Sequence, residues 1–172
     1  MFSNFVYYIF VPFVMGIPSR RLRLFFLKML GLKVGKNTLI SRFVSFRDCK
    51  NIEIGEGCVI NPHVLLDGRG AKIRIGNNVD IAQESTIWTM SHDKHTHEAF
   101  AKNVIINDYA WICNRVIILP GVEIGQDSIC AAGSVVTKSV PSNCVVSGVP
   151  AIKVSERNRT KDYKLVFDSV FR

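Results

Sequence analysis

One stretch decides the fold: residues 106–136 read INDYAWICNRVIILPGVEIGQDSICAAGSVV. Within it an aliphatic residue or a cysteine recurs at every sixth position, often followed by a small residue; these positions are Ile106, Ile112, Ile118, Ile124, Cys130 and Val136. A period of six does not match the turn of an α-helix, and the many β-branched residues favour strands. The spacing predicts a solenoid in which each unit is a short strand plus a tight corner, and three units close one triangular coil.

The same period continues upstream of this stretch. It appears at Ile54 and Ile60, and again at Ile75, Ile81 and Ile87. In such a solenoid the aliphatic residue points inward and stacks on its equivalent in the next coil, so several coils must stack to bury a core. We expect an all-β solenoid domain over residues 34–154, interrupted slightly at 68–72 and more widely at 92–103.

The interruption at 92–103, HDKHTHEAFAKN, is polar and holds three of the four histidines. Loops that leave a rigid scaffold are where binding and catalytic residues concentrate. The sequence therefore predicts that this loop carries function.

Residues 1–33 are predicted to form an apolar and basic helical segment. The apolar run at 5–17 is shorter than the roughly 20 residues of a membrane span, and basic residues follow it, whereas in a secretory signal they precede it. Residues 20–30 place apolar side chains at helical spacing and so predict an amphipathic helix. This helix either packs on the rest of the protein or lies on an anionic membrane, as part of a contact made by residues 5–30.

Charge and cysteine content bear on partners and compartment. The formal net charge of +8 indicates anionic partners but does not choose among nucleic acid, lipid and phosphate-bearing molecules; no RNA or DNA motif accompanies it. The five cysteines lack C-x-x-C spacing, so we expect reduced packing residues in a reducing compartment. Residues 155–172 are charged and then apolar, and are predicted as a C-terminal helix or tail.

Further segments carry a more specific signal than the repeat. In chain order they are Ser91-His92-Asp93, Trp111-Ile112, LPGVEIG at 119–125, AGSVVTK at 132–138 and GVPA at 148–151. This ordered set resembles the maltose/galactoside O-acetyltransferase superfamily, and the SHD form with Phe100 after it is most similar to bacterial exopolysaccharide acetyltransferases of the colanic-acid type. The resemblance implies a left-handed parallel β-helix that transfers an acetyl group from acetyl-CoA to a sugar or glycan hydroxyl.

The resemblance also implies roles for the loop and for one corner. It makes His92 the general base, because a neutral imidazole near pH 7 can accept the proton of a hydroxyl as that oxygen attacks a thioester. It places Asn61 and Asp93 at the acceptor, although Asn also suits a plain turn. Asp93, Glu98 or a backbone carbonyl are candidates for holding the second ring nitrogen of His92.

For the co-substrate, the resemblance implies a groove between neighbouring subunits of a homotrimer. The matching positions, with Lys153 added as a candidate partner of the CoA phosphates, are Trp111, Asn114, Ala132, Thr137, Lys138 and Lys153. Cys113 stands where the family has Gly or Ala, and Cys does not adopt a positive φ cheaply. The implied setting is the bacterial cytoplasm, at the inner face of the membrane where lipid-linked glycans are built, with no metal required.

The sequence also allows other functions. N-acetylation of an amino sugar and acetylation of a streptogramin-type drug need the same scaffold. A zinc enzyme of the γ-carbonic anhydrase class would use the spacing of His92 and His97, but Gln83 and Trp88 stand where the paired histidines of that class would be. A non-catalytic scaffold is the alternative of another class.

Overall fold

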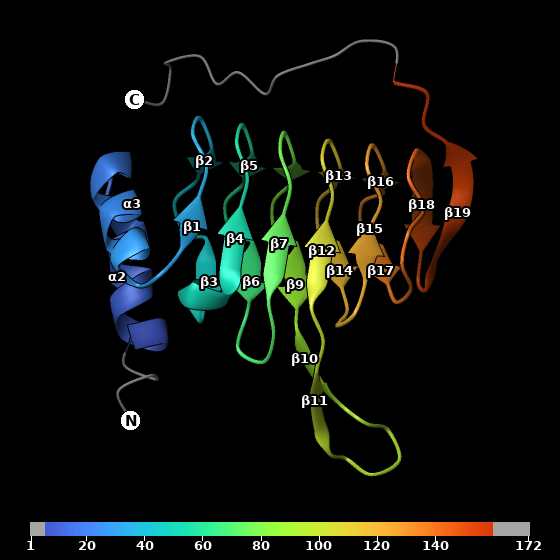
Figure 1. Cartoon of the computed structure of the whole chain (residues 1–172), viewed down its shortest axis with the longest axis horizontal. Coiled ribbons are helices and arrows are strands. Elements are labelled where there is room, and N and C mark those ends of the chain that lie inside the picture. The colour runs from blue at the N-terminus through green and yellow to red at the C-terminus, as the bar shows by residue number, and fades with distance from the viewer. Residues whose placement is uncertain (1–5, 160–172) are drawn as a thin grey trace.

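The structure, a computed structural model, describes residues 6–159 and shows a parallel β-solenoid of about five coils with helices at one end (Figure 1). Each coil passes in turn through three sheets, which we call A, B and C. Sheet A contains β1 (Lys33–Val34), β4 (Ile52–Ile54), β7 (Ile73–Ile75), β12 (Val104–Ile106) and β15 (Glu123–Ile124). Sheet C contains β3 (Ser45–Arg47), β6 (Leu65–Asp67), β9 (Thr86–Trp88), β14 (Ile117–Ile118) and β17 (Val135–Val136).

Sheet B is the longest and carries the end of the described chain. Its strands are β2 (Leu39–Ile40), β5 (Val59–Ile60), β8 (Asp80–Ile81), β13 (Trp111–Ile112), β16 (Ile129–Cys130), β18 (Cys144–Gly148) and β19 (Ala151–Glu156). All neighbours pair in parallel except β18 and β19, which are antiparallel. β19 therefore runs two residues into the segment predicted as a tail, and residues 160–172, where the rest of that prediction falls, lie outside the described part.

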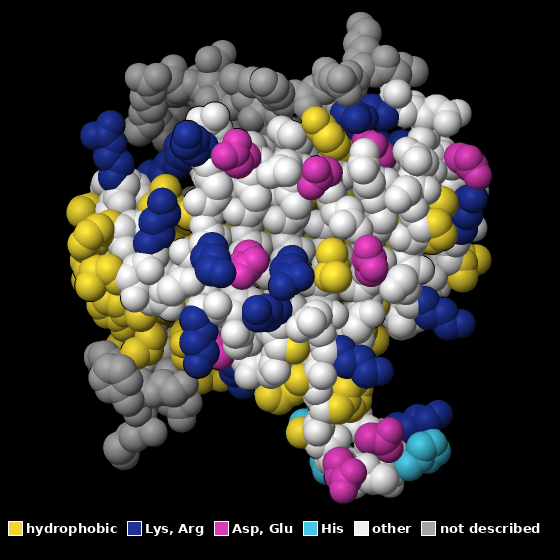
Figure 2. Space-filling model, viewed as in Figure 1, with side chains coloured by type: hydrophobic (Ala, Val, Ile, Leu, Met, Phe, Trp, Pro, Cys, Tyr) yellow, Lys and Arg dark blue, Asp and Glu magenta, His cyan; other side chains and the backbone are white. Residues whose placement is uncertain are grey.

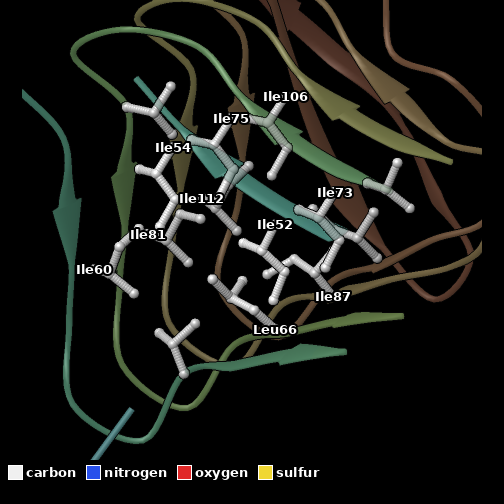
Figure 3. Packing of buried hydrophobic residues seen from close by; sticks show 14 of the residues in the cluster. Ile52, Ile54, Ile60, Leu66, Ile73, Ile75, Ile81, Ile87, Ile106 and Ile112 are labelled. Carbon is white, nitrogen blue, oxygen red and sulfur yellow. The ribbon is translucent and has the colours of Figure 1, made fainter. Parts of the chain in front are cut away.

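The six-residue period is the inward-facing position of each strand, as predicted. In sheet A, Ile54, Ile75, Ile106 and Ile124 pair in register from coil to coil, and Figure 3 shows how such side chains from successive coils stack in one column. The inward residues of all three sheets are buried and belong to one cluster. Burial of an aliphatic side chain contributes about 1.5–3 kcal/mol to stability. The cluster of inward-facing side chains is therefore the main source of the stability of the solenoid.

The tight corners are turned mostly by residues other than the small ones that often follow the inward-facing residue. The left-handed backbone conformation recurs once per coil between sheets B and C, and mostly on residues other than glycine; these are Phe43, His63, Glu84, Arg115 and Gly133. Gly55 has a different reason: a Cβ there would collide with backbone of the next coil at Gly76. Cys113 does not have a positive φ, because Arg115 takes the left-handed conformation at that corner. A cysteine in place of the family's Gly or Ala therefore causes no backbone strain there.

The helices close the open end of the core. A short π-helix, η1 (Val6–Phe10), continues into α2 (Val11–Gly16), and α3 (Arg20–Met29) follows. Met15 and Leu27 are fully buried and join the same cluster as Ile40 and Phe46 of the first coil. A single 3-10 turn, η2 (Cys49–Asn51), precedes β4. In residues 6–159, none of the helices is long and apolar enough to cross a bilayer.

Helix α3 lies where residues 20–30 predicted it, but much of the predicted apolar stripe faces outward. Leu22, Phe25 and Met29 of that stripe are exposed. The side chains that reach the interior are Arg23 and Leu27, which are buried, with Leu24 and Leu30 packed partly against the core. The guanidinium of Arg23 donates hydrogen bonds to the carbonyls of two residues just before α3 and to the carbonyl of Ile40 on β2. The last bond satisfies a carbonyl of the first coil, which no strand precedes.

Candidate active site

A β-hairpin leaves the solenoid at the corner between sheets C and A. Its strands, β10 (Met90–His92) and β11 (Ala99–Ala101), are antiparallel and pair His92 with Ala99. Figure 1 shows the hairpin projecting away from the coils, and Figure 2 shows that it carries histidine and acidic side chains at its end. The polar interruption at 92–103 therefore belongs to an ordered arm that begins after β9. This arm places His92 outside the coils.

The ring of His92 is exposed and stacks on that of His97, with 5.0 Å between the ring centroids. Asp93 does not hold this ring: its Oδ1 accepts the backbone N–H groups of His95 and Thr96 at 2.8 and 3.0 Å. These two hydrogen bonds lower the pKa of Asp93 below its usual value, and the bond from Thr96 has the larger effect. The Asp93 carboxylate therefore shapes the turn that follows His92.

The root of the hairpin is held by residues that the sequence reasoning missed. The hydroxyl of Thr89 donates to the carbonyl of Asp67 at 2.7 Å, and the backbone N–H of Lys102 donates to the carbonyl of Thr89 at 2.9 Å. At Gly70 an added Cβ would lie 2.5 Å from the Cβ of Ala101, so only glycine lets the loop pass under β11. The slight interruption at 68–72 was the one sequence signal of this support.

Buried Asp67 fixes the same corner electrostatically. Its carboxylate pairs with Arg69 at 2.8 Å and with Arg47 at 3.1 Å. Burial alone would raise the pKa of Asp67, but the hydrogen bonds and charges of the two guanidinium groups outweigh burial and hold that pKa below its usual value. The guanidinium of Arg47 also lies over the rings of Trp88 and Tyr8, which ties the corner to the N-terminal helices.

A second group of predicted site residues lies on sheet B and at its corner with sheet C. Trp111 faces outward on β13 and is 43% exposed, beside Asp80 on β8. The amide nitrogen of Asn61 donates to Asp80 Oδ1 at 2.9 Å and to the carbonyl of Ile81 at 3.0 Å. Burial raises the pKa of Asp80, and the bond from Asn61 offsets only part of that. Asn61 is thus anchored in the corner, as expected of an Asn that serves a turn. Its side-chain oxygen takes no part in these two bonds.

The remaining predicted positions divide between two corners. Asn114 and Ala132 stand on the corner between sheets B and C, where the N–H of Gly133 donates to the carbonyl of Asn114 at 2.9 Å. Thr137 and Lys138 follow β17 and so stand on the corner from which the hairpin leaves, two coils further on. Lys153 lies on β19 and pairs with Glu156 at 2.8 Å.

One chain therefore brings the predicted residues together in two sets. Asn61, Trp111, Asn114 and Ala132 belong to sheet B and its corner with sheet C. His92 and Asp93, with Thr137 and Lys138, belong to the corner between sheets C and A. A strand of sheet C separates the two sets in each coil. In residues 6–159, no group of three or more His, Cys, Asp or Glu is arranged to hold a metal ion.

Known proteins are similar to this chain in sequence and in architecture. No family model matches the sequence. The chain is 35% identical over 144 residues to a putative colanic acid biosynthesis acetyltransferase of Escherichia coli, covering 82% of this chain and 78% of the relative. It is 33% identical over 150 residues to the galactoside O-acetyltransferase of Escherichia coli, covering 81% and 73%.

The structural comparison agrees. A hexapeptide-repeat acetyltransferase of Vibrio cholerae O1 biovar eltor, solved in complex with acetyl-CoA, superposes with a TM-score of 0.80 at 29% identity, covering 87% of this chain and 84% of that one. The fold class is thus the left-handed parallel β-helix expected from the sequence. The SHD hairpin, the outward Trp on sheet B and the six-residue core occur together in a chain that belongs to the hexapeptide-repeat acetyltransferases of the galactoside and colanic-acid acetyltransferase group.

Proposed function

We propose that this protein transfers an acetyl group from acetyl-CoA to a hydroxyl of a sugar or polysaccharide precursor, with His92 as the general base. The observation that carries the proposal is the placement of His92: it stands at the first strand of an arm that leaves the solenoid, with its imidazole exposed and no carboxylate of the same turn bound to it. Membership of an acetyltransferase family supports the reaction class.

The proposed step is direct transfer in a ternary complex. One ring nitrogen of His92 accepts the hydroxyl proton while the oxygen attacks the thioester carbonyl. The tetrahedral oxyanion requires hydrogen-bond donors, for which backbone N–H groups at a coil edge are suitable. Collapse breaks the C–S bond, and the CoA thiolate leaves and takes up the proton that His92 accepted, which returns the imidazole to its neutral form. Because a thiolate is a good leaving group, His92 needs no separate acid partner.

The co-substrate is proposed to lie over the residues that stand on the two corners. Ala132 and Gly133 leave little side chain above the backbone, so an extended pantetheine arm can approach closely. Lys138 is exposed and available for a phosphate, whereas Lys153 would first have to leave Glu156. Trp111, Asn114 and Thr137 complete the proposed site.

We further propose a homotrimer in which each site takes its two sets of residues from neighbouring subunits. The separation of His92 and Trp111 by sheet C within one chain supports this proposal. A cyclic assembly would bring the hairpin corner of one subunit against the sheet B corner of the next.

Co-expression of a His92→Ala chain with a Trp111→Ala chain tests the shared site. Each inactive variant lacks a different half, so in randomly mixed trimers about a quarter of the sites would hold both intact residues. Acetyl transfer restored to that level, with neither variant active alone, is the expected result. If the mixture is as inactive as its parents although mixed trimers form, the site lies within one chain.

The acceptor class follows the relatives, whose names refer to colanic acid and galactoside substrates. A sugar hydroxyl is therefore proposed over an amine. The enzyme is incubated with acetyl-CoA and equal concentrations of a sugar and its 2-amino analogue, and the products are then treated with alkali. Alkali cleaves an acetyl ester and leaves an acetyl amide intact, so the surviving product shows which group was acetylated. A product that resists alkali would replace O-acetylation with N-acetylation.

A further inference from the structure

The helical end of the molecule presents an apolar face to the outside. We call it the cap face: six large side chains of η1, α2 and α3, namely Tyr8 (54% exposed), Ile9 (59%), Phe13 (72%), Leu22 (49%), Phe25 (58%) and Met29 (70%). Figure 2 shows hydrophobic side chains gathered at that end, with lysines and arginines beside them. An exposed apolar surface of this kind marks an interaction site.

These side chains are not surplus core. Closure of the solenoid is already made by Val11, Val14, Met15 and Leu27, all of which are buried. An edge-on ring contact of Phe10 with Phe26, with 5.8 Å between the ring centroids, joins η1 to α3, and within α3 Phe26 also contacts Phe25 at 5.5 Å. The exposed Phe25 of the cap face is therefore held by a ring contact that links η1 and α3.

The helices that carry the cap face have charge of one sign: η1, α2 and α3 contain Arg20, Arg21, Arg23 and Lys28 and no acidic residue. The first 47 residues contain eight of the 22 lysines and arginines of the chain and none of its 14 acidic residues, so the remaining 14 basic and 14 acidic residues cancel. By count, the net charge of +8 equals the charge of this segment, in which Lys33 pairs with Glu53 and Arg47 with Asp67 of later coils. Arg20, Arg21 and Lys28 of α3 are exposed, whereas Arg23 is used internally.

We propose that the cap face binds the surface of an anionic lipid bilayer. An apolar face on short helices, flanked by exposed lysine and arginine, is the composition of an interfacial helix, which inserts its apolar side chains among the acyl chains and keeps its cations at the headgroups. The helices are too short to span the bilayer, so the protein lies on the membrane.

A second copy of the chain fits the cap face less well. Two such faces in contact would each bring only basic residues from positions 1–47, and like charges oppose that contact. An anionic bilayer supplies both an apolar interior and the missing negative charge. This inference stands apart from the acetyl-transfer proposal, and either can fail without the other.

Co-sedimentation of the full chain with lipid vesicles tests it. Vesicles of equal parts phosphatidylglycerol and phosphatidylcholine are compared with vesicles of phosphatidylcholine alone. The protein is expected to sediment with the first and much less with the second, and added salt is expected to release it. The double variants Phe13→Ser/Phe25→Ser and Arg21→Gln/Lys28→Gln are each expected to lower the partition coefficient at least about tenfold.

The matched control is Ile152→Ser/Val154→Ser on β19. These side chains are similarly exposed, at 65% and 57%, but Figure 1 places β19 at the opposite end of the solenoid. This control is expected to bind the anionic vesicles as wild type does. Binding that survives both cap-face variants overturns the proposal. So does sedimentation equilibrium without vesicles in which the Phe variant forms a smaller assembly than wild type, since the cap face would then be a protein–protein contact.

Discussion

The carboxylate of Asp93 receives two backbone N–H groups on the same oxygen, Oδ1. An asparagine side chain offers the same oxygen without the charge, and Asn is as suited as Asp to this kind of turn. The geometry therefore separates two roles for Asp93: shaping the loop after His92, or binding the acceptor through its charge.

We predict that Asp93→Asn keeps kcat/KM within about threefold of wild type while Asp93→Ala loses about tenfold or more, because only alanine abandons the turn. Steady-state kinetics with acetyl-CoA and one sugar acceptor measure both. A loss in Asp93→Asn as deep as in Asp93→Ala would instead support the acceptor-binding role.

Asp67 is the residue whose titration should govern stability at the hairpin corner. Its pKa is lowered in the folded protein, so its contribution is present above the unfolded-state pKa of about 3.9 and is lost as the pH falls through the folded value. Asp67→Asn leaves Arg47 and Arg69 without their counter-charge, and we expect it to cost about 1–3 kcal/mol at pH 7.

Urea denaturation of both proteins from pH 7 downward checks this. The gap between wild type and Asp67→Asn is expected to be constant down to about pH 4 and to narrow at lower pH. A gap that does not change with pH would mean that the carboxylate charge is not what stabilises this corner.

Single residues also show what the sequence could reveal. His92 was identifiable because its motif and the break in the repeat coincide. The roles of Thr89 and Gly70 were not, because a hydroxyl that bonds a carbonyl in another coil leaves no local pattern. Arg23 reads as a surface charge in sequence; its burial depends on carbonyls that are exposed only because the first coil has no predecessor.

At the scale of elements, the strands were predictable and the helix orientation was not. The six-residue period assigns an inward position in every coil, and each assigned residue is buried. The same periodicity argument predicted an amphipathic helix at residues 20–30 and left open whether its apolar side packs on the protein or faces outward. A hydrophobic stripe shows that a helix has an apolar side, but whether that side contacts the core or another partner depends on tertiary structure.

The element that carries the proposed base is the β10–β11 hairpin, and its root offers a direct test. Gly70→Ala places a methyl group 2.5 Å from Ala101 and must shift β11 or the loop beneath it. We expect kcat to fall by about tenfold or more, since misplacement of a catalytic group by about 1 Å can cost that much, while the melting temperature changes little because the core is untouched.

Gly16→Ala is the matched control for this substitution, because no atom lies within 4 Å of the added methyl group. It should leave kcat at the wild-type value. Equal kinetics of Gly70→Ala and Gly16→Ala would show that the hairpin is not held by its contact with Gly70.

At the scale of the whole molecule, different coils along the axis of the solenoid carry different features. Its helical end carries basic and exposed apolar side chains, its middle coils carry the hairpin and Trp111, and β18 and β19 finish sheet B. A stack of coils with one core couples neighbours strongly and distant coils weakly. The proposed membrane contact and the proposed catalytic site can therefore be varied independently by mutation.

The central claim is that His92 is the base of an acetyl transfer. The most direct measurement is the release of free CoA thiol from acetyl-CoA by wild type and by His92→Ala, against a panel of sugars and glycan intermediates. We predict turnover with one acceptor class by wild type, and a loss of at least about a hundredfold in His92→Ala with acetyl-CoA binding retained. Turnover by His92→Ala equal to that of wild type would contradict the assignment of the base, and no thiol release together with no acetyl-CoA binding by wild type would contradict the transferase account itself.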